Sequence, residues 1–267
     1  MRIAIIISAD PAGENILREL LGRYPFQESV AFREKPTYRY QDLSIYQSPI
    51  RCINNEHIDD EIAADLFVFA TTHRSAQNIP ALTCHAPGNW GKAEFGGEDK
   101  VLCRTSACYL KALLLTLMQK NTLGWDTVQE ITHHGPALQK PVIFAEIGST
   151  EAEWGNAEAG RIMAESIVEV FSRPAPSCRA AIGIGGLHTM PNLRKAVERS
   201  EYAIGHACPK YWLERLDKEM LQQAIERTVE RVELVILDWK GLKGEKERII
   251  SLLEEMGMKW ERSERMY

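Results

Sequence analysis

Short apolar runs rich in β-branched residues alternate along this chain with stretches of helical periodicity, and this alternation limits the possible folds more than any other feature. Each run is bounded by residues typical of turns, so each is predicted to be a buried strand. The predicted strands cover residues 2–8, 65–70, 81–83, 141–145, 180–184, 202–204 and 232–237. Helices are predicted over residues 11–24, 105–120, 126–131, 156–171, 192–199, 213–232 and 245–256. Such alternation favours a three-layer α/β/α fold around a mostly parallel mixed sheet.

The whole chain, residues 1–267, is predicted to form a single α/β domain. It has no internal repeat or clear linker, and its 45% hydrophobic and 26% charged residues are typical of folded proteins. No apolar run approaches the roughly 20 residues of a membrane-spanning helix. The apolar start of the chain is too short for a signal peptide. We therefore expect a cytoplasmic protein.

The cysteines are scattered and include no Cys-x-x-Cys pair. They are Cys52, Cys84, Cys103, Cys108, Cys178 and Cys208. This pattern is unlike the disulfide framework of a small secreted protein and gives little support to a four-cysteine zinc site. We expect free thiols in a reducing compartment.

The charge balance argues against nucleic-acid binding through bulk charge. The formal net charge is -5, whereas domains that bind in this way are usually basic. A local basic patch is still compatible with the sequence, and Lys240 and Lys243 are its candidates for phosphate contacts. By number alone, a solvated surface is the simpler interpretation of these lysines.

All seven histidines lie between residues 51 and 208, and several follow predicted strands. Five strands are followed by loops rich in His, Gly, Thr and Glu, which begin at Thr71, Cys84, Glu146, Gly185 and Gly205. In open α/β sheets, ligands bind outside the carboxyl ends of the strands. If the five strands are parallel, four histidines and at least one carboxylate converge at one edge of the sheet.

Histidines and carboxylates at such an edge can hold a zinc ion that activates water for hydrolysis. The predicted zinc ligands are His85, Glu146, His188 and His206. His73 and Cys208 are further candidates, and no ligand belongs to a local signature such as His-Glu-x-x-His. The alternative for each histidine is that it hydrogen-bonds loop backbone and orders a turn.

Other residues near these loops have two interpretations each. His133 and His134 follow a predicted helix, where the helix dipole favours histidine, and one of them is a candidate general acid or base. Trp90 and Trp154 are candidates for stacking on a base or ribose, with buried packing as the alternative. The glycines at 183–186 lack the rest of a dinucleotide fingerprint and are predicted to allow close backbone approach to a ligand.

Six segments carry a resemblance to a known family. They are 72–75 (Thr-His-Arg-Ser), 84–91 (Cys-His-Ala-Pro-Gly-Asn-Trp-Gly), 146–150 (Glu-Ile-Gly-Ser-Thr), 185–188 (Gly-Gly-Leu-His), 205–207 (Gly-His-Ala) and 238–241 (Asp-Trp-Lys-Gly). In this order they resemble the archaeal and plant type of D-aminoacyl-tRNA deacylase. The resemblance implies an enzyme that hydrolyses the ester between a D-amino acid and the terminal ribose of tRNA, releasing both.

The resemblance also implies bound Zn²⁺, a fold like that of phosphorylases and peptidyl-tRNA hydrolases, and a cytosolic monomer without a protein partner. We predict catalytic roles for His73, His134 and Glu151. The predicted substrate-binding residues are Arg74, Asn89, Trp90, Gly185, Gly186, Lys240 and Lys243. Selection of the D isomer would come from a pocket whose shape clashes with the L side chain.

Three other functions are compatible with the same residues. A zinc-dependent exopeptidase or amidase would act on free peptides and would not need tRNA. A non-catalytic module that binds tRNA or a nucleotide would show no turnover and no effect of chelation. A metal-free hydrolase would rely on positioning and an oxyanion hole, so that changes at Glu146, His188 or His206 would alter its rate without altering metal content.

Overall fold

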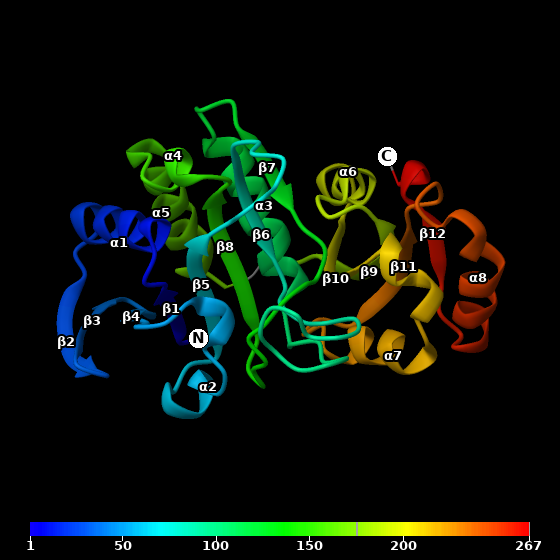
Figure 1. Ribbon diagram of the computed structural model, residues 1–267, viewed down its shortest axis with the longest axis horizontal. Helices are drawn as coiled ribbons and strands as arrows, with labels where there is room; N and C mark the ends of the chain where they lie inside the picture. Colours follow the sequence, from blue (N-terminus) through cyan, green and yellow to red (C-terminus); the bar gives the residue numbers. More distant parts are fainter. Residues whose placement is uncertain (175, 267) are drawn as a thin grey trace.

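The computed structural model describes residues 1–174 and 176–266, which form two β-sheets lying side by side (Figure 1). The strand order is β2-β3-β4-β1-β5-β8-β6-β7 in the first sheet and β10-β9-β11-β12 in the second. The first sheet contains β1 (Ile3–Ile7), β2 (Gln27–Phe32), β3 (Lys35–Tyr40), β4 (Leu43–Gln47), β5 (Leu66–Thr72), β6 (Ala81–His85), β7 (Asp126–Gln129) and β8 (Val142–Gly148). The second contains β9 (Arg179–Gly186), β10 (Tyr202–Pro209), β11 (Val232–Leu237) and β12 (Trp260–Arg262).

Most strand pairs are parallel, which confirms the predicted fold class. Strands β4, β1, β5 and β8 run parallel, and every pair of the second sheet is parallel. Strands β2, β3 and β4 form antiparallel pairs, and β6 runs antiparallel to β8. The assumption that five strands end at one edge of one sheet is therefore wrong. Only residues 73–80 join β5 to β6, and a parallel crossover needs a dozen or more.

Polar side chains cap the first turns of the main helices. The side chains of Asp10, Ser106 and Asn156 accept backbone N–H bonds in the first turns of α1, α3 and α5. The helices are α1 (Pro11–Arg23), α2 (Ile58–Glu61), α3 (Ala107–Lys120), α4 (Glu151–Trp154), α5 (Ala157–Phe171), α6 (Pro191–Arg199), α7 (Lys218–Glu226) and α8 (Lys246–Glu255). Short 3-10 helices are η1 (Cys52–Asn54), η2 (Lys210–Arg215), η3 (Lys243–Glu245) and η4 (Ser263–Arg265). None of the helices in the described ranges is long and apolar enough to cross a membrane.

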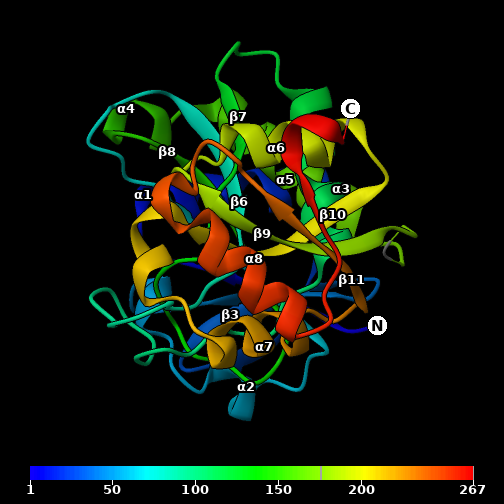
Figure 2. The same cartoon turned by 90° about the vertical axis from the view of Figure 1, so that its right-hand side faces the viewer.

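Helix α3 packs between the two sheets. It contacts β6 and β7 of the first sheet and β9 and β10 of the second, and its apolar residues belong to a core cluster that spans both sheets. Helices α1 and α5 share this core, whereas α2 and η1 cover the opposite face of the first sheet. The far side of the second sheet is covered by α7 and α8, and Figure 2 shows α8 crossing in front of β9 and β11.

Two predicted helices are wrong. The segment 213–232 is divided, because η2 ends at Arg215 and Asp217 caps the new helix α7 by accepting from the Met220 N–H. The segment 126–131 begins with strand β7, which pairs in parallel with β6. The strands β2, β3, β4 and β12 were not predicted from the sequence.

The expectation that all cysteines are free is wrong for one pair. Cys108 in the first turn of α3 and Cys178, next to β9, form a disulfide with a Cα–Cα distance of 5.7 Å. Their sequence separation is 70, so only the tertiary fold brings them together. The other cysteines are free and buried.

Candidate active site

A cluster of five histidines and two glutamates lies where the first sheet meets the second. Its members are His73, His85, Glu130, His133, His134, Glu146 and His188. Glu130 is central, because its Oε1 lies 3.3 Å from His73 Nδ1 and 3.4 Å from His188 Nε2. Its Oε2 lies 3.2 Å from His133 Nε2. Glu146 makes the second set of contacts: its Oε2 lies 3.5 Å from His73 Nδ1, and its Oε1 lies 3.7 Å from His85 Nε2.

Three strands of the first sheet carry part of this cluster. Glu146 lies within β8, where the strand register places it between Thr71 of β5 and Thr83 of β6. Thr83 Oγ1 donates a hydrogen bond to Glu146 Oε2 at 3.4 Å. His85 is the last residue of β6, and His73 directly follows β5. Their side chains can therefore reach Glu146 from both neighbouring strands.

The segment after β7, residues 130–134, joins the first sheet to the second. The backbone N–H of Ile131 donates to the carbonyl of His188, and that of Thr132 donates to the carbonyl of Ala207. His188 follows β9, and Ala207 belongs to β10. These bonds place the histidines and the glutamate of the segment beside groups from both sheets.

The imidazole rings of the cluster pack directly on one another. The ring centroids of His85 and His133 are 4.2 Å apart, and those of His133 and His134 are 4.3 Å apart. His188 extends the group, with its centroid 4.6 Å from that of His133. One ring nitrogen from each of His85, His133 and His134 lies within 4.8 Å of the others, close enough to share a metal ion.

The two glutamates are held ionised, and together they favour a charged His73. Burial raises the pKa of Glu130, but contacts with His133 and His188 hold it well below its usual range. Burial also opposes the ionisation of Glu146, and its contacts with two histidines lower its pKa. Burial lowers the pKa of His73, but the two glutamates raise it to about 9. Without a metal ion, an imidazolium therefore lies between two carboxylates at neutral pH.

His133 and His134 are instead favoured as neutral imidazoles. Burial, followed by the charge of His85, lowers the pKa of His133 to about 4. Burial and the two neighbouring rings lower the pKa of His134 well below its usual value. In His85 the effect of burial is outweighed by the nearby Glu146, which raises its pKa. Neutral imidazole is the form that binds a metal ion.

The donor atoms of the cluster fit a zinc ion. His85 Nδ1 lies 3.2 Å from the carbonyl of Ala86, and His134 Nδ1 lies 2.7 Å from that of Gly135. Such contacts fix the tautomer of a ligand histidine and leave Nε2 as its donor. His85 Nε2 is buried without a hydrogen-bond partner among the described residues. Imidazole and carboxylate donors are those that catalytic zinc prefers.

A pocket of about 520 Å³ borders the cluster. His133, His134 and His188 form part of its wall, and the side chain of His188 is 46% exposed. The other lining residues come from the loop after β6 and from η2: Asn89, Lys92, Glu94, Phe95, Tyr211, Trp212, Glu214 and Arg215. The volume is in the range of small-molecule sites.

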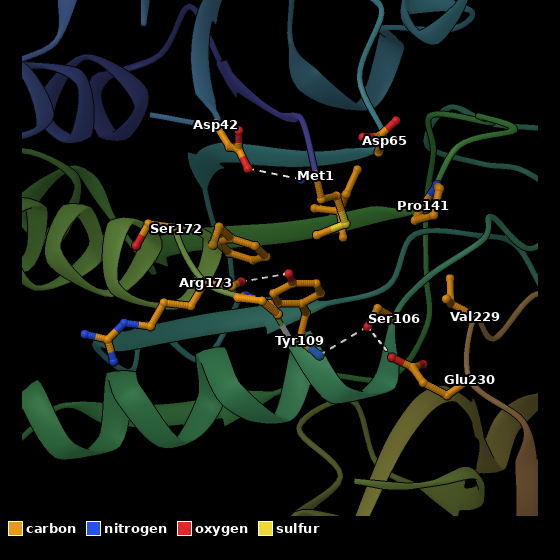
Figure 3. A pocket seen from close by; sticks show the side chains of 13 residues that line it. Met1, Asp42, Asp65, Ser106, Tyr109, Pro141, Ser172, Arg173, Val229 and Glu230 are labelled. Atoms are coloured by element: carbon orange, nitrogen blue, oxygen red, sulfur yellow. Dashed lines mark hydrogen bonds and ion pairs between the residues drawn. The ribbon is translucent and has the colours of Figure 1, made fainter. Parts of the chain in front are cut away.

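Another pocket, of about 380 Å³, includes none of the cluster residues. Figure 3 shows that its polar groups bond to each other: the amino group of Met1 contacts Asp42, and the Tyr109 hydroxyl donates to the Arg173 carbonyl. Glu230 accepts from the Ser106 hydroxyl and from backbone N–H groups at the start of α3. The polar residues of this pocket therefore cap the start of α3 and hold the chain in place.

Known proteins similar to this chain identify its family. The model of the D-aminoacyl-tRNA deacylase family matches residues 60–261. The chain belongs to this family. D-aminoacyl-tRNA deacylases of Thermococcus kodakarensis and Pyrococcus abyssi are 38% and 37% identical to it, over 97% of this chain and 99% of each relative. A crystal structure described as a conserved protein of unknown function has a TM-score of 0.91 and 29% identity, covering 99% of this chain and 96% of the other.

Three of the four zinc ligands predicted for this deacylase-family chain lie in the cluster, but no group of three donor atoms found among the described residues contains more than one of them. His85, Glu146 and His188 lie in the cluster, but His206 does not. His206 is fully buried in β10, where its Nδ1 lies 3.1 Å from Thr132 Oγ1, and burial lowers its pKa to about 4. Cys208, the further candidate on β10, is also buried, and the donor groups found among the described residues do not include it.

Of the three residues predicted to be catalytic, two lie in the cluster. His73 contacts both glutamates, and His134 lines the pocket. Glu151 is instead exposed in the first turn of α4, beside a separate pocket that Arg74 and Trp154 also line. Arg74 stacks on the Trp154 ring, with its guanidinium carbon 4.6 Å from the ring centroid.

Two of the predicted substrate-binding residues, Asn89 and Trp90, lie in the loop after β6 and have different roles there. Asn89 lines the pocket, and its side-chain amide donates to the carbonyls of Gly96 and Glu98, which fixes the loop. Trp90 is only 5% exposed, and its indole N–H donates to the Ala207 carbonyl. The structure thus places Trp90 in the core, where it fastens the loop to the second sheet, rather than against a ligand.

The remaining predicted substrate-binding residues lie at the ends of β9 and β11. Gly185 and Gly186 end β9, and Gly185 has a φ of 103°. A Cβ on Gly185 would lie 3.1 Å from the Asp238 carbonyl oxygen, so the close approach is to the chain itself. Lys240 and Lys243 are exposed after β11, and phosphate binding by them stays a prediction.

The sequence does not single out Glu130, the central carboxylate, because its pattern over residues 126–131 favours a helix. A helix would direct Glu130 differently from the irregular segment that follows β7. Two features of the sequence could have revealed it. Thr127 and Val128 are β-branched and favour a strand, and an acidic residue three positions before a histidine pair is a candidate partner of that pair.

Proposed function

We propose that this chain hydrolyses the ester joining a D-amino acid to the terminal ribose of tRNA, and that the histidine–glutamate cluster is its reaction centre. The observation that carries the proposal is the convergence of five histidines and two glutamates beside a pocket, in a chain of the D-aminoacyl-tRNA deacylase family. Water adds to the ester carbonyl, and the bond to the ribose oxygen breaks. The ribose oxygen then receives the proton that the water loses.

The residues that would hold a zinc ion are His85, His133 and His134. A zinc ion there would lower the pKa of the attacking water to about 7 and polarise the ester carbonyl. Glu130 orients His133, and the carbonyls of Ala86 and Gly135 orient the other two rings. Glu146 faces His85 and adds negative charge that favours a cation at this place.

His188 is the cluster member suited to move the proton. Its side chain is 46% exposed on the pocket wall, and its Nε2 lies 3.4 Å from Glu130 Oε1. A carboxylate in this position orients the imidazole. His188 would accept the proton of the attacking water and donate it to the ribose oxygen. This role differs from the ligand role predicted from the sequence.

The decisive experiment measures deacylation of D-tyrosyl-tRNA and L-tyrosyl-tRNA before chelation, after exhaustive chelation and after zinc is restored. We expect hydrolysis of the D ester alone. Chelation should abolish this activity, and added zinc should restore it. D-selective turnover that survives chelation would keep the function and contradict the zinc site. Turnover of free peptides without either tRNA ester would favour an exopeptidase, and binding without turnover would favour a non-catalytic module.

The His188→Ala variant separates its two possible roles. A group that moves the proton can be removed with loss of rate but with zinc content unchanged. A ligand cannot be removed without loss of zinc. We expect kcat to fall by about 100-fold or more with wild-type zinc content, measured by atomic absorption.

The cellular location and the oligomeric state are proposals that rest on the sequence. We propose a cytoplasmic monomer, since the substrate is tRNA and the family resemblance implies no partner chain. Light scattering of the purified protein tests the oligomeric state, and a dimer mass would contradict it.

A further inference from the structure

Two exposed aromatic side chains line the same pocket. Phe95 is 66% exposed and Tyr211 is 60% exposed, while every other described Phe, Tyr or Trp is buried or half-buried. Both belong to the pocket whose wall includes His133 and His188. A single exposed apolar side chain needs no explanation, but two exposed aromatic rings grouped at one cavity indicate a binding surface.

Phe95 and Tyr211 reach this pocket from distant parts of the chain. Phe95 lies in the loop between β6 and α3, and its carbonyl accepts the backbone N–H of Gly135, the residue after His134, at 2.9 Å. Tyr211 lies in η2, directly after β10. The backbone of Phe95 is thus fixed beside the histidine pair while its ring is free for a ligand.

Trp212 fixes the position of η2 and so of Tyr211. A Cβ on Gly91 would lie 2.3 Å from two carbons of the Trp212 ring, so only a glycine lets this indole pack on the loop. The guanidinium carbon of Arg215 lies 5.7 Å from the centroid of the same ring. The Tyr211 and Trp212 centroids are 6.4 Å apart. One aromatic ring is held against the protein, and its neighbour is exposed at the pocket.

The charges at the pocket do not favour a phosphate-rich ligand. Lys92 and Arg215 are matched by Glu94 and Glu214 among the lining residues. Binding through phosphates requires an excess of positive charge and weakens steeply with salt, whereas stacking on aromatic rings needs only a flat π face. The lining therefore suits a base better than a phosphate.

We propose that Phe95 and Tyr211 form a subsite that stacks on the adenine of the 3′-terminal adenosine of tRNA. This inference rests on the proposed function. The ester to be cleaved is attached to the ribose that carries this adenine, so the base and the reacting histidines must share one pocket. Unpaired bases are bound by stacking on Phe and Tyr.

The first test compares the steady-state kinetics of Phe95→Ala and Tyr211→Ala with those of the wild type. For D-tyrosyl-tRNA we expect KM to rise on the order of 5- to 100-fold, with kcat nearly unchanged, because stacking is lost equally from the ground state and the transition state. Hydrolysis of D-tyrosine ethyl ester, which has no base, should be unchanged. Tyr211→Phe keeps the ring and should restore the wild-type KM.

A second readout does not depend on activity. Adenosine 5′-monophosphate should bind the wild type more tightly than uridine 5′-monophosphate does, and both alanine variants should lose this preference in isothermal titration calorimetry. The affinity of the wild type for adenosine 5′-monophosphate should also change little between low and moderate salt. Ile50→Ala removes an exposed apolar side chain outside the pocket lining and serves as the matched control, which should behave as wild type.

The outcomes separate the two proposals. A wild type that does not cleave D-tyrosyl-tRNA contradicts the proposed function, whatever the nucleotide binding. Cleavage with unchanged KM and unchanged nucleotide binding in both alanine variants overturns the stacking subsite alone. A fall in kcat on both the tRNA ester and the ethyl ester also overturns it, because the side chains would then support the reaction centre and not the base.

Discussion

At the scale of single residues, Glu130 connects the parts of the site. Its two oxygens face His73, His133 and His188, so one carboxylate orients three rings that come from three different segments. It is fully buried among charged or polar partners, and removing its charge would leave His73 with Glu146 as its remaining carboxylate contact. The site therefore depends on this residue for both ring orientation and charge balance.

The Glu130→Gln variant tests this dependence. The amide keeps the shape but carries no charge, so His133 and His188 lose their orienting carboxylate. We expect deacylation of D-tyrosyl-tRNA to fall at least 10-fold and zinc affinity to fall about 10- to 100-fold. Competition with a fluorescent zinc chelator measures the affinity. Glu169→Gln, a change on the surface of α5, is the control, and wild-type affinity in Glu130→Gln would contradict the assignment.

A pH dependence follows from the charged state of His73. Its pKa rises from 6.5 to about 9 in the folded chain, so its stabilisation is complete below pH 6.5 and is lost as the pH rises toward 9. In the metal-free protein, we expect the free energy of unfolding to fall by roughly 3 kcal/mol across this window. Urea denaturation in the presence of a chelator measures it. The His73→Gln variant should show a smaller fall, to which His85 still contributes because its pKa is also raised, and identical profiles would contradict the charged histidine.

At the scale of elements, the loop after β6 and the short helix η2 build the pocket together. The loop is fastened to the second sheet by the Trp90 indole N–H, which donates to the Ala207 carbonyl. It is fastened to α7 where the Leu102 N–H donates to the Gln223 side chain. Gly91 completes the contact by admitting the Trp212 ring. The pocket wall is therefore made of two irregular segments held by neighbouring regular elements.

Replacing Gly91 by alanine should disturb this wall without disturbing the cluster. The added Cβ would meet the Trp212 ring at 2.3 Å, so η2 must shift. We expect KM for D-tyrosyl-tRNA to rise severalfold while the zinc content stays that of the wild type. Gly22→Ala, on the open face of α1, is the control and should have no effect on KM. Unchanged KM in Gly91→Ala would show that the wall tolerates the shift.

Local signals predicted the regular elements well where capping and periodicity agreed. The starts of α1, α3 and α5 follow from Asp10, Ser106 and Asn156, because a cap is a contact within one turn. The predictions failed where the pattern was short or interrupted, as in β7 and in the segment that Asp217 divides. Apolar spacing over six residues cannot distinguish a strand from a helix.

At the scale of the whole molecule, the reaction centre depends on how the two sheets are held together. Helix α3 packs between them, and the Cys108–Cys178 disulfide ties the start of that helix to the second sheet. Cluster residues come from both sheets, so a change in their relative position would separate His188 from Glu130. The disulfide therefore adds stability to the interface that carries the site.

Breaking this disulfide should destabilise the fold. The chain-entropy model gives about 4 kcal/mol for a closed loop of this length, whose ends are 70 residues apart. We expect a reducing agent to lower the Tm of the wild type in calorimetry but not that of the Cys108→Ser/Cys178→Ser variant, which should already melt at the lower temperature. Thiol titration of the denatured, unreduced protein should find four free cysteines. Six would contradict the pairing.

The fold class, most strands and helices, and the kinds of residue that gather at the site can be predicted from the sequence, because these follow from local periodicity, caps and loop composition. Which of those residues meet depends on contacts between distant segments. The antiparallel direction of β6, the separate second sheet and the irregular segment after β7 admit Glu130 and His133 to the cluster and leave His206 outside it. Strand pairing and ring contacts join residues that are far apart in the chain, so a short stretch of sequence does not determine the energies of these contacts.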